Sequence, residues 1–314
     1  MTVNAWLDVW LRDYQGHTTG RTVMTYSSAL DNYVRPVIGR VLMAKLKPMH
    51  IMRVLSGMQG RNLSPTTQRQ TYNIMKNAMK SAIIAGVIKT DHTNGVKVPK
   101  RNVKPFKIID RQQIQAFVSA AQDTPFPNEL LLMLYTGLRV GELRGLMWQD
   151  ADLDGAKLKV ERQLYAHAHS TGFGFPKYGE VRTIELIPEA VAVLRRQRVR
   201  QAQQQLAAGT NWKDTDISHD LIFRQSMGQP HTNSSLARAV KSAGEAIGIS
   251  DLHPHELRHS YAVAAIRSGM DVKTVQHNMG HKSASVTLDT YANYTTDAGK
   301  IGAIKLSDYF KNTT

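Results

Sequence analysis

The residues best suited to chemistry lie near the C-terminal end of the chain. His255 and Arg258 follow Pro254, and a proline in the first turn of a helix loses no hydrogen bond. Three residues apart on a helix, the two side chains share one face near the positive end of the helix dipole. Such a position favours an anion, and a phosphate is the natural candidate. His281 and, ten residues later, Tyr291 add a second imidazole and a phenolic hydroxyl.

The same stretch also permits a metal-binding interpretation. His255-Glu256-Leu257-Arg258-His259 matches H-E-x-x-H, the helix motif that places two histidines on zinc beside a glutamate base. The charged Arg258 would stand beside the metal, and no third ligand follows in a G-x-x-H arrangement. A zinc metallopeptidase is therefore the less favoured alternative, from another class of enzyme.

Length and composition limit the class of protein. At 314 residues the chain is long enough for two domains, each with its own core. It contains no cysteine, which excludes disulfides, thiolate zinc sites and a cysteine nucleophile, and fits a reducing cytoplasm. No N-terminal run resembles a signal peptide, and no window approaches the ~20 apolar residues of a membrane span. We therefore expect a cytoplasmic protein.

Positive charge is concentrated in the first third of the chain. The net charge is +15; residues 1–107 hold 17 Lys and Arg against 4 Asp and Glu, while residues 108–314 hold 23 against 21. So uneven a distribution predicts a polyanionic partner held mainly by the first part. Nucleic acid is the favoured partner, and an anionic membrane surface is the less favoured one.

The first hundred residues predict an all-helical domain. Apolar residues recur at helical spacing over residues 3–14 and 22–37, and further helices begin at Pro48 and at Ser64-Pro65. A basic, proline-flanked linker follows. Basic side chains of the helices and of this linker are candidates for contacts with a DNA backbone: Arg21, Lys45, Lys47, Arg69, Lys76, Lys80, Lys100, Arg101 and Lys104.

The remainder predicts helices with a few strands. Helices are expected over residues 110–121, 129–135, from Pro188 onward, and over 233–248, 254–268 and 271–279. Strands are expected over residues 158–164, 181–186 and 221–223. The first two strands flank a glycine-rich hairpin loop at 171–180, which contains Lys177.

Arg139 is placed unusually for a residue that only meets solvent. It lies between Gly137 and Gly141, directly after an apolar segment that must be buried. A buried or half-buried arginine needs an anion or several hydrogen-bond acceptors. Arg139 is therefore a second candidate for binding a phosphate.

These motifs together resemble those of the tyrosine recombinases, the phage integrase family. The run from Thr136 to Glu142 is similar to the family's T-G-x-R-x-x-E motif, which Trp148 and Asp150 continue. Pro176-Lys177 and the Arg182-Thr183-Ile184 strand resemble the hairpin that carries the family's catalytic lysine, although Tyr178-Gly179-Glu180-Val181 replaces a more polar run. The C-terminal motifs follow in the family's order and spacing: His255, Arg258, Gly280-His281 and Tyr291.

The resemblance implies one catalytic site. Its expected members are Arg139, Lys177, His255, Arg258, His281 and the nucleophile Tyr291, with Glu142 in support. Two guanidiniums, Arg139 and Arg258, would clamp the nonbridging oxygens and offset charge in the transition state. His255 would act as a general base or hydrogen-bond partner, and Lys177 would protonate the leaving 5′ oxygen. Tyr294 is the second choice for the nucleophile.

The family also implies a fold and partners. We expect a mainly helical protein with a small antiparallel sheet: a SAM-like core-binding domain over residues 1–97, a linker over 98–107 and an α+β catalytic domain over 108–314. The implied reaction resembles that of type IB topoisomerases, proceeds through a 3′-phosphotyrosine and a Holliday junction, and needs neither metal nor ATP. Double-stranded attachment sites, a tetrameric synapse and accessory DNA-bending or directionality factors are the implied partners, in the nucleoid of a bacterial host.

Two features bear on the subgroup. The stretch of residues 195–248 looks more like that of integrases of phages and mobile elements than the compact Xer-type resolvases, which remain the alternative within the family. The chain opens directly on the core-binding domain, without the arm-site-binding domain of many such integrases. We expect a naturally short integrase, which a longer reading frame upstream would rule out. The apolar residues in the C-terminal segment, about 300–314, are expected to pack on a neighbouring protomer.

Overall fold

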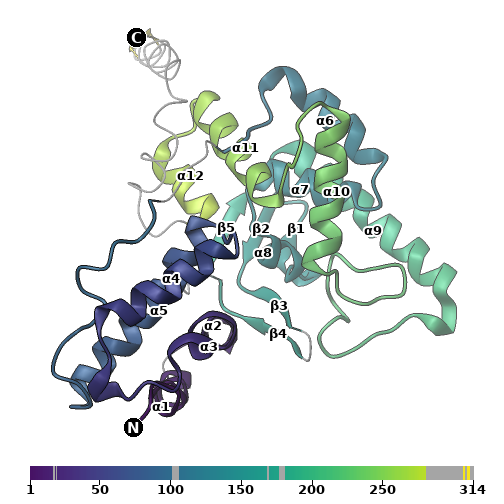
Figure 1. Cartoon of the computed structure of the whole chain (residues 1–314). Helices are drawn as coiled ribbons and strands as arrows, with labels where there is room; N and C mark the ends of the chain where they lie inside the picture. Colours follow the sequence, from purple (N-terminus) through teal and green to yellow (C-terminus); the bar gives the residue numbers. More distant parts are fainter. Residues whose placement is uncertain are drawn as a thin grey trace. The chain divides into compact units, whose positions relative to one another are not determined.

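The computed structural model describes residues 1–16, 18, 20–100, 106–167, 170–176, 181–280, 307, 310 and 311 (Figure 1). Over these residues the fold is mainly helical with small antiparallel sheets, which confirms the expected fold class. The chain divides into two compact units, residues 1–105 and 106–314. The division falls within the basic, proline-flanked stretch of the sequence.

Unit 1 is a helical bundle closed by tryptophans of its first helix. Its helices are α1 (Val3–Gln15), α2 (Gly20–Ala29), α3 (Arg35–Ile38), α4 (Pro48–Gly60) and α5 (Pro65–Ile84). Trp6 donates its indole N–H to the carbonyl of Ala78 (2.9 Å), and Trp10 donates to the hydroxyl of Ser81 (3.1 Å). Because both acceptors lie on α5, these bonds fix α1 against α5 while the indole rings fill the core.

The single helix expected over residues 22–37 is interrupted. A π-helical turn, Leu30–Val34, separates α2 from α3. Pro36 has no N–H to donate to the carbonyl of Asn32, and Arg61 donates to that carbonyl instead (3.1 Å). The proline therefore explains the change of helical geometry.

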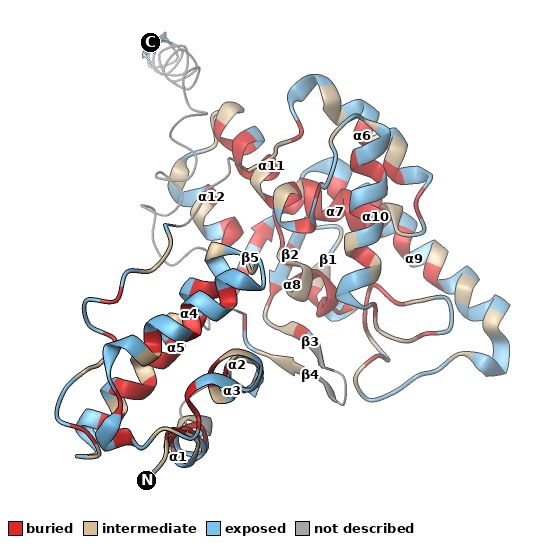
Figure 2. Ribbon diagram, in the orientation of Figure 1, coloured by how far each residue is buried: buried red, intermediate tan, exposed pale blue. Residues whose placement is uncertain are grey.

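Unit 2 is built around one buried helix. Its helices are α6 (Ile114–Gln122), α7 (Pro127–Thr136), α8 (Val140–Arg144), α9 (Pro188–Ala208), α10 (Asn233–Ala246), α11 (Pro254–Arg267) and α12 (Val272–Met279). α7 is buried almost throughout, and α6, α9, α10 and α11 pack around it (Figure 2). Within the described parts of both units, no helix combines the length and apolarity needed to cross a membrane.

Two small antiparallel sheets accompany these helices. β1 (Ala151–Asp152), β2 (Lys157–Val160) and β5 (Arg182–Glu185) form one sheet, and β3 (Gln163–His167) pairs with β4 (Ser170–Gly174) in the other. In the first sheet, Val160 lies opposite Arg182 and Leu158 opposite Ile184. All four of these side chains are buried, so the arginine faces the interior together with its apolar neighbours.

Three details of the expected strands are wrong. The strand expected over residues 158–164 breaks at Glu161-Arg162, where the Arg162 guanidinium turns to the buried carboxylate of Asp150 (2.5 Å). β4 occupies part of the expected glycine-rich loop, because the Tyr165 ring packs closely over its glycines. Residues 221–223 are buried, but Leu221 makes only an isolated bridge to Met147.

Candidate active site

A left-handed glycine at the end of α7 begins the site. Gly137 has φ = 66° and donates its N–H to the carbonyl of Met133 (3.0 Å). A Cβ here would lie 2.4 Å from the ring of Tyr261, so a larger residue is excluded on two grounds. The carbonyl of Gly137 accepts a hydrogen bond from Nη1 of Arg258 (2.6 Å). The end of α7 therefore orients an arginine of α11.

Glu142 caps the start of α8 at Arg139. Arg139 is the N-cap, and its backbone N–H donates to Oε2 of Glu142 (3.0 Å). Oε1 of the same carboxylate accepts from Nη1 of Arg139 (2.7 Å). Glu142 is completely buried, whereas 18% of the Arg139 side chain is exposed. The glutamate thus fixes a guanidinium that still reaches the surface.

Arg182 of β5 binds the other side of Glu142. Its Nη1 donates to Oε1 (3.1 Å) and its Nη2 to Oε2 (2.7 Å), a two-bond fork between side chains at most 2% exposed. Burial by itself would raise the pKa of the Glu142 carboxyl. Hydrogen bonds and positive charge from Arg182, together with Arg139, outweigh this and lower the pKa below its usual value. The carboxylate is therefore ionised between two cations.

Three successive carbonyls at the end of α12 each accept a hydrogen bond from a different arginine. The Asn278 carbonyl accepts from Nε of Arg182 (2.9 Å), and the Gly280 carbonyl accepts from Nη2 of Arg139 (2.7 Å). Between them, the Met279 carbonyl accepts from Nη2 of Arg258. Cations are favoured at this negative end of a helix. We call Arg139, Arg182, Arg258 and Glu142 the arginine cluster; three cations against one carboxylate leave it net positive.

His255 lies one turn before Arg258 on α11, at the surface. Its ring meets that of His259 edge to face, with ring centroids 4.6 Å apart. His259 in turn stacks on Phe106, with centroids 4.4 Å apart. Desolvation, followed by the charges of His255 and Arg258, lowers the pKa of His259 to about 4. His259 is thus a neutral ring between His255 and the first residue of unit 2.

This low pKa makes His259 a source of acid sensitivity. The unfolded chain takes up a proton near pH 6.5 and the folded chain only near pH 4, so the stability of the fold falls as pH drops through that window. We expect His259→Phe, which keeps an aromatic ring, to reduce the stability lost between pH 7 and pH 4.5 by about 1–2 kcal/mol. Urea unfolding at several pH values measures this, with the exposed His219→Phe as control. Equal pH dependence in His259→Phe and wild type would contradict the assignment.

Glu256 caps α11. One carboxylate oxygen accepts from the backbone N–H of His253 (2.7 Å) and the other from that of Lys107 (3.3 Å). In H-E-x-x-H the glutamate would instead be a base beside a metal. Among the residues that the structure describes, no three His, Asp or Glu side chains group as metal ligands. The motif therefore acts in the structure as a helix start that joins residues 106–107 to α11.

Several expected site residues fall outside the described residues. These are the catalytic candidates Lys177, His281 and Tyr291, the alternative nucleophile Tyr294, the linker residues Arg101 and Lys104, and nearly all of the segment 300–314. The structure brings together Arg139, Glu142 and Arg258, and it places His255 on the same helix as Arg258. The carbonyls bound by the arginine cluster end one residue before His281.

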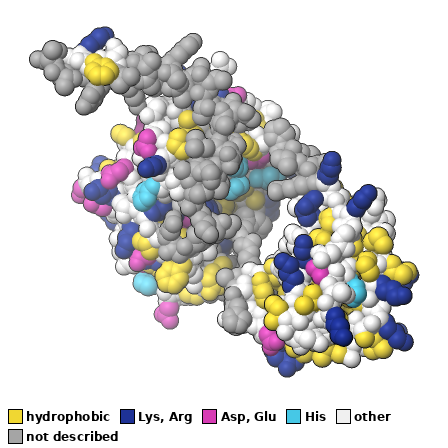
Figure 3. Space-filling view, turned by 90° about the vertical axis from the view of Figure 1, so that its left-hand side faces the viewer, with side chains coloured by type: hydrophobic (Ala, Val, Ile, Leu, Met, Phe, Trp, Pro, Cys, Tyr) yellow, Lys and Arg dark blue, Asp and Glu magenta, His cyan; other side chains and the backbone are white. Residues whose placement is uncertain are grey.

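Three of the expected DNA contacts lie on α5. Arg69, Lys76 and Lys80 are spaced seven and four residues apart, so they follow one face of α5. Nη2 of Arg69 donates to the carbonyl of Pro99 (3.2 Å), which brings the exposed Lys100 to the same helix. Two further exposed candidates, Lys45 and Lys47, precede α4, and Arg21 belongs to α2. Figure 3 shows Lys and Arg spread over unit 1 with few acidic side chains between them.

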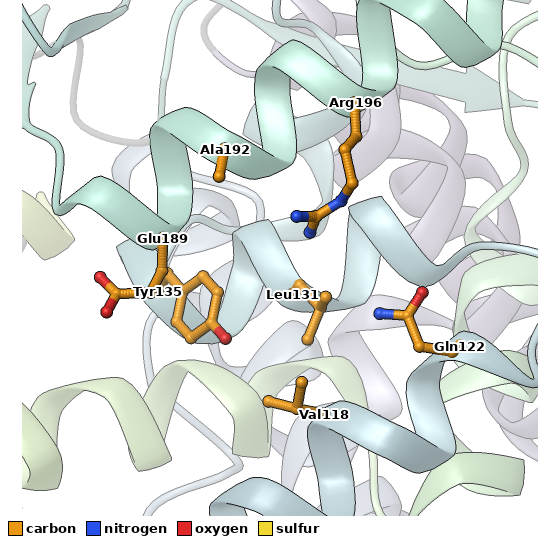
Figure 4. A pocket seen from close by; sticks show the side chains of 7 residues that line it. All are labelled: Val118, Gln122, Leu131, Tyr135, Glu189, Ala192 and Arg196. Carbon is orange, nitrogen blue, oxygen red and sulfur yellow. The ribbon is translucent and has the colours of Figure 1, made fainter.

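A shallow groove of about 430 Å³ lies elsewhere on unit 2, between α6, α7 and α9 (Figure 4). Gln122, Tyr135, Glu189 and Arg196 provide its polar side chains. Burial, and then the charge of Glu189, raise the pKa of Tyr135 against the opposing charge of Arg196. None of the residues that line this groove belongs to the arginine cluster, so it is not part of the site.

Arg182 is not among the site residues expected from the sequence, although a signal for it exists. In the strand expected over residues 181–186, Ile184 and Leu186 mark the buried face by their alternation. Arg182 has the same parity and must point inward with them. A buried arginine requires a carboxylate or carbonyl partner. The pattern therefore predicts a buried ion pair, but it does not identify Glu142 as the partner.

Comparisons with known proteins identify the family of the chain. Residues 107–297 match the Phage integrase family, and residues 2–59 match the phage integrase N-terminal SAM-like domain. A XerC-like tyrosine recombinase of Caldanaerobacter subterraneus subsp. tengcongensis is 24% identical over 87% of this chain and 74% of its own length. An integrase of Streptomyces ambofaciens is 26% identical over 93% of this chain and 76% of its own.

Solved structures share the fold. The Tn1549 transposon integrase in complex with a circular intermediate DNA has a TM-score of 0.80 at 22% identity and covers 98% of this chain and 99% of that one. A lambda integrase tetramer bound to a Holliday junction has a TM-score of 0.70 at 20% identity, covering 95% and 78%. Because the Phage integrase family match covers more than half of the chain, the chain belongs to the phage integrase family of tyrosine recombinases.

Proposed function

We propose that the protein is a site-specific DNA recombinase of the integrase type, which integrates or excises a phage or mobile element. The observation that carries this proposal is the arginine cluster. Arg139 and Arg258, 119 positions apart in the sequence, are bound to adjacent carbonyls of one helix end, Gly280 and Met279. Two guanidiniums held this way suit the two nonbridging oxygens of one phosphodiester.

The proposed reaction is attack by the Tyr291 hydroxyl on the scissile phosphorus. The bond from phosphorus to the 5′ oxygen breaks, leaving a 3′-phosphotyrosine and a free 5′ hydroxyl. Lys177 protonates the leaving oxygen, and His255, with His281, assists the attack and binds the phosphate. The two arginines stabilise charge that develops on the phosphate. The tyrosine ester keeps the energy of the phosphodiester, so religation needs no ATP, and the charge on the arginines replaces a metal.

The proposed substrate is double-stranded DNA carrying an attachment site. The solved integrases of similar fold are DNA complexes, and one is a tetramer on a Holliday junction. By the same arrangement, four copies of this chain would act on two duplexes, with the C-terminal segment packed on a neighbour and with accessory DNA-bending or directionality factors. The basic face of α5 would bind phosphates in unit 1, which makes affinity fall steeply with salt.

A Xer-type resolvase is the second candidate, because several similar proteins carry that name. The two functions differ in the geometry of the substrate. A resolvase acts on directly repeated sites in one molecule, an arrangement that excision shares, whereas integration joins sites on two separate molecules. Joining of two separate plasmids would favour the integrase, and recombination confined to directly repeated sites in one plasmid would favour the resolvase.

The first test uses covalent capture on DNA. The full chain is incubated with a pool of randomised duplexes, each nicked near the centre so that cleavage releases a short strand and traps the adduct, with EDTA throughout. We expect adducts that resist denaturation, that enrich one sequence, and that release a strand whose 5′ hydroxyl is phosphorylated directly by polynucleotide kinase. Attachment to a 5′ end, or adducts only when a metal is supplied, would contradict the proposal.

A further inference from the structure

Arg182 stands in the centre of the arginine cluster, behind the two arginines proposed to bind phosphate. It makes three hydrogen bonds, two to the carboxylate of Glu142 and one to the carbonyl of Asn278. Its side chain is 2% exposed, whereas that of Arg139 is 18% exposed. Nε, Nη1 and Nη2 of Arg182 all donate to acceptors of the protein, so its side chain acts within the fold rather than on the substrate. Its contacts act on Arg139 and on the end of α12.

Resting on the function proposed above, we propose that Arg182 is a positioning residue that prevents Glu142 from neutralising Arg139 and fixes the chain that leads to the nucleophile. Oε1 of Glu142 is shared between the two arginines, at 2.7 Å from Arg139 and 3.1 Å from Arg182. Arg182 makes its shorter hydrogen bond to Oε2, at 2.7 Å. The Arg139 guanidinium thus holds one oxygen of the carboxylate rather than both, while the Arg139 backbone N–H donates to the other (3.0 Å).

The net charge of the arginine cluster explains why the Arg139 guanidinium must not bind both oxygens of Glu142. A buried carboxylate and one arginine form a neutral pair, and such a pair attracts a phosphate only weakly. With Arg182 present, two guanidiniums face the single carboxylate of Glu142. One positive charge is therefore left over, and it remains on Arg139, whose guanidinium reaches the surface. Without Arg182, a planar carboxylate would favour a two-bond fork with Arg139. That fork would turn the Arg139 guanidinium away from the substrate and cancel its charge.

Arg182 also links three elements that are distant in sequence. It belongs to β5, five positions after Lys177; its carboxylate partner belongs to α8, and its carbonyl partner ends α12. Beside it, His277 of α12 contacts the carbonyl of Thr183 in β5 (3.0 Å). Gly280 lies so close that a Cβ there would be 2.9 Å from Nη1 of Arg182. The end of α12, and with it the start of the segment bearing His281 and Tyr291, is therefore set by β5.

The test compares Arg182→Met, Glu142→Gln and the double variant on the selected nicked duplex. Arg182→Met is expected to slow single-turnover cleavage by about 100-fold, the size of effect typical for loss of a supporting residue. Adding Glu142→Gln removes the carboxylate that would neutralise Arg139, so the double variant is expected to cleave about 10-fold faster than Arg182→Met. If Arg182 served only the folding of the chain, the double variant would instead cleave more slowly than Arg182→Met, because it loses still more of the buried hydrogen bonds.

A neutral substrate gives a second, independent measurement. A methylphosphonate at the scissile position replaces one charged oxygen by a methyl group and lessens the need for two cations. On it, the deficit of Arg182→Met relative to wild type is expected to shrink from about 100-fold to less than about 10-fold. The control is Arg224→Met, which removes another buried arginine that is paired with Asp214 in a loop outside the cluster. Arg224→Met should lower the midpoint of unfolding. At 25 °C its cleavage deficit relative to wild type should be the same on the methylphosphonate as on the phosphodiester.

The outcomes separate this inference from the proposed function. If wild type forms no adduct with any duplex, the proposed function fails. If wild type cleaves and Arg182→Met cleaves equally fast, or if the double variant is as slow as Arg182→Met, the inference is overturned while the function stands. Should Arg182→Met not fold, Arg182→Lys is measured instead; because it keeps the charge, it is expected to cleave within about 10-fold of wild type. A folded Arg182→Lys more than about 10-fold slower than wild type would also overturn the charge argument.

Discussion

Replacing Arg258 by lysine is expected to slow DNA cleavage by about 100- to 1,000-fold, with little change in DNA affinity. The charge is retained, but an ammonium cannot bind the carbonyls of Gly137 and Met279 and a phosphate oxygen in one plane. Many other cations of the protein contribute to affinity, so only the transition state loses stabilisation. Adduct formation under single-turnover conditions measures the rate, and gel retardation measures binding.

Arg267→Lys is the matched control for this prediction. Arg267 is at the end of the same helix, more than a third of its side chain is exposed, and it pairs loosely with Asp110 (3.6 Å). It should cleave within a factor of about two of wild type, because exposed ion pairs contribute little. An Arg258→Lys variant that cleaves as fast as Arg267→Lys would show that Arg258 does not clamp the phosphate.

Gly280→Ala is expected to impair cleavage by about 100-fold and to lower stability by about 1–2 kcal/mol. The residue has φ = 59°, and a Cβ there would lie 2.9 Å from Nη1 of Arg182 and 3.3 Å from Nη1 of Arg139. The backbone strain accounts for the loss of stability. The loss of activity follows because both guanidiniums must move, and the Gly280 carbonyl holds one of them.

Gly248→Ala separates these two causes. Gly248 also has a positive φ, 79°, but no atom lies within 4 Å of the position of its Cβ. Its alanine variant should therefore show a similar loss of stability, measured by urea unfolding, with cleavage near the wild-type rate. If both variants lose activity to the same extent, the contact between Gly280 and the arginines is not the cause.

Local signals predict the helices of this fold well. Ser64 caps α5 by accepting from the N–H of Thr67 (3.1 Å), and Asp271 caps α12 by accepting from the N–H groups of Lys273 and Thr274. Both are short-range bonds that residue type and spacing reveal. The strands are predicted less well, because the break at Arg162 depends on a distant carboxylate, that of Asp150. Side-chain contacts of this kind leave no periodic pattern in the sequence.

The contacts of the site also divide into short-range ones, which the sequence predicts, and long-range ones, which it does not. Arg139 and Glu142 are three residues apart, and the bond from the Arg139 backbone N–H to the Glu142 carboxylate follows from that spacing. The bond between Arg139 and Gly280 spans 141 positions, and the pair of Glu142 with Arg182 spans 40. No local rule predicts which carbonyl or carboxylate a buried arginine will meet after the chain has folded. The roles of Lys177, His281 and Tyr291, outside the described residues, stay predictions.

The central claim is that Tyr291 attacks the phosphate, and one gel tests it most directly. Wild type, Tyr291→Phe and Tyr294→Phe are incubated in EDTA with the nicked duplex selected by covalent capture, then separated under denaturing conditions. If Tyr291 is the nucleophile, we expect covalent adducts with wild type and Tyr294→Phe and none with Tyr291→Phe. The Tyr291→Phe variant should still bind the duplex in a native gel. An adduct that persists with Tyr291→Phe and is lost with Tyr294→Phe would contradict the assignment of the nucleophile.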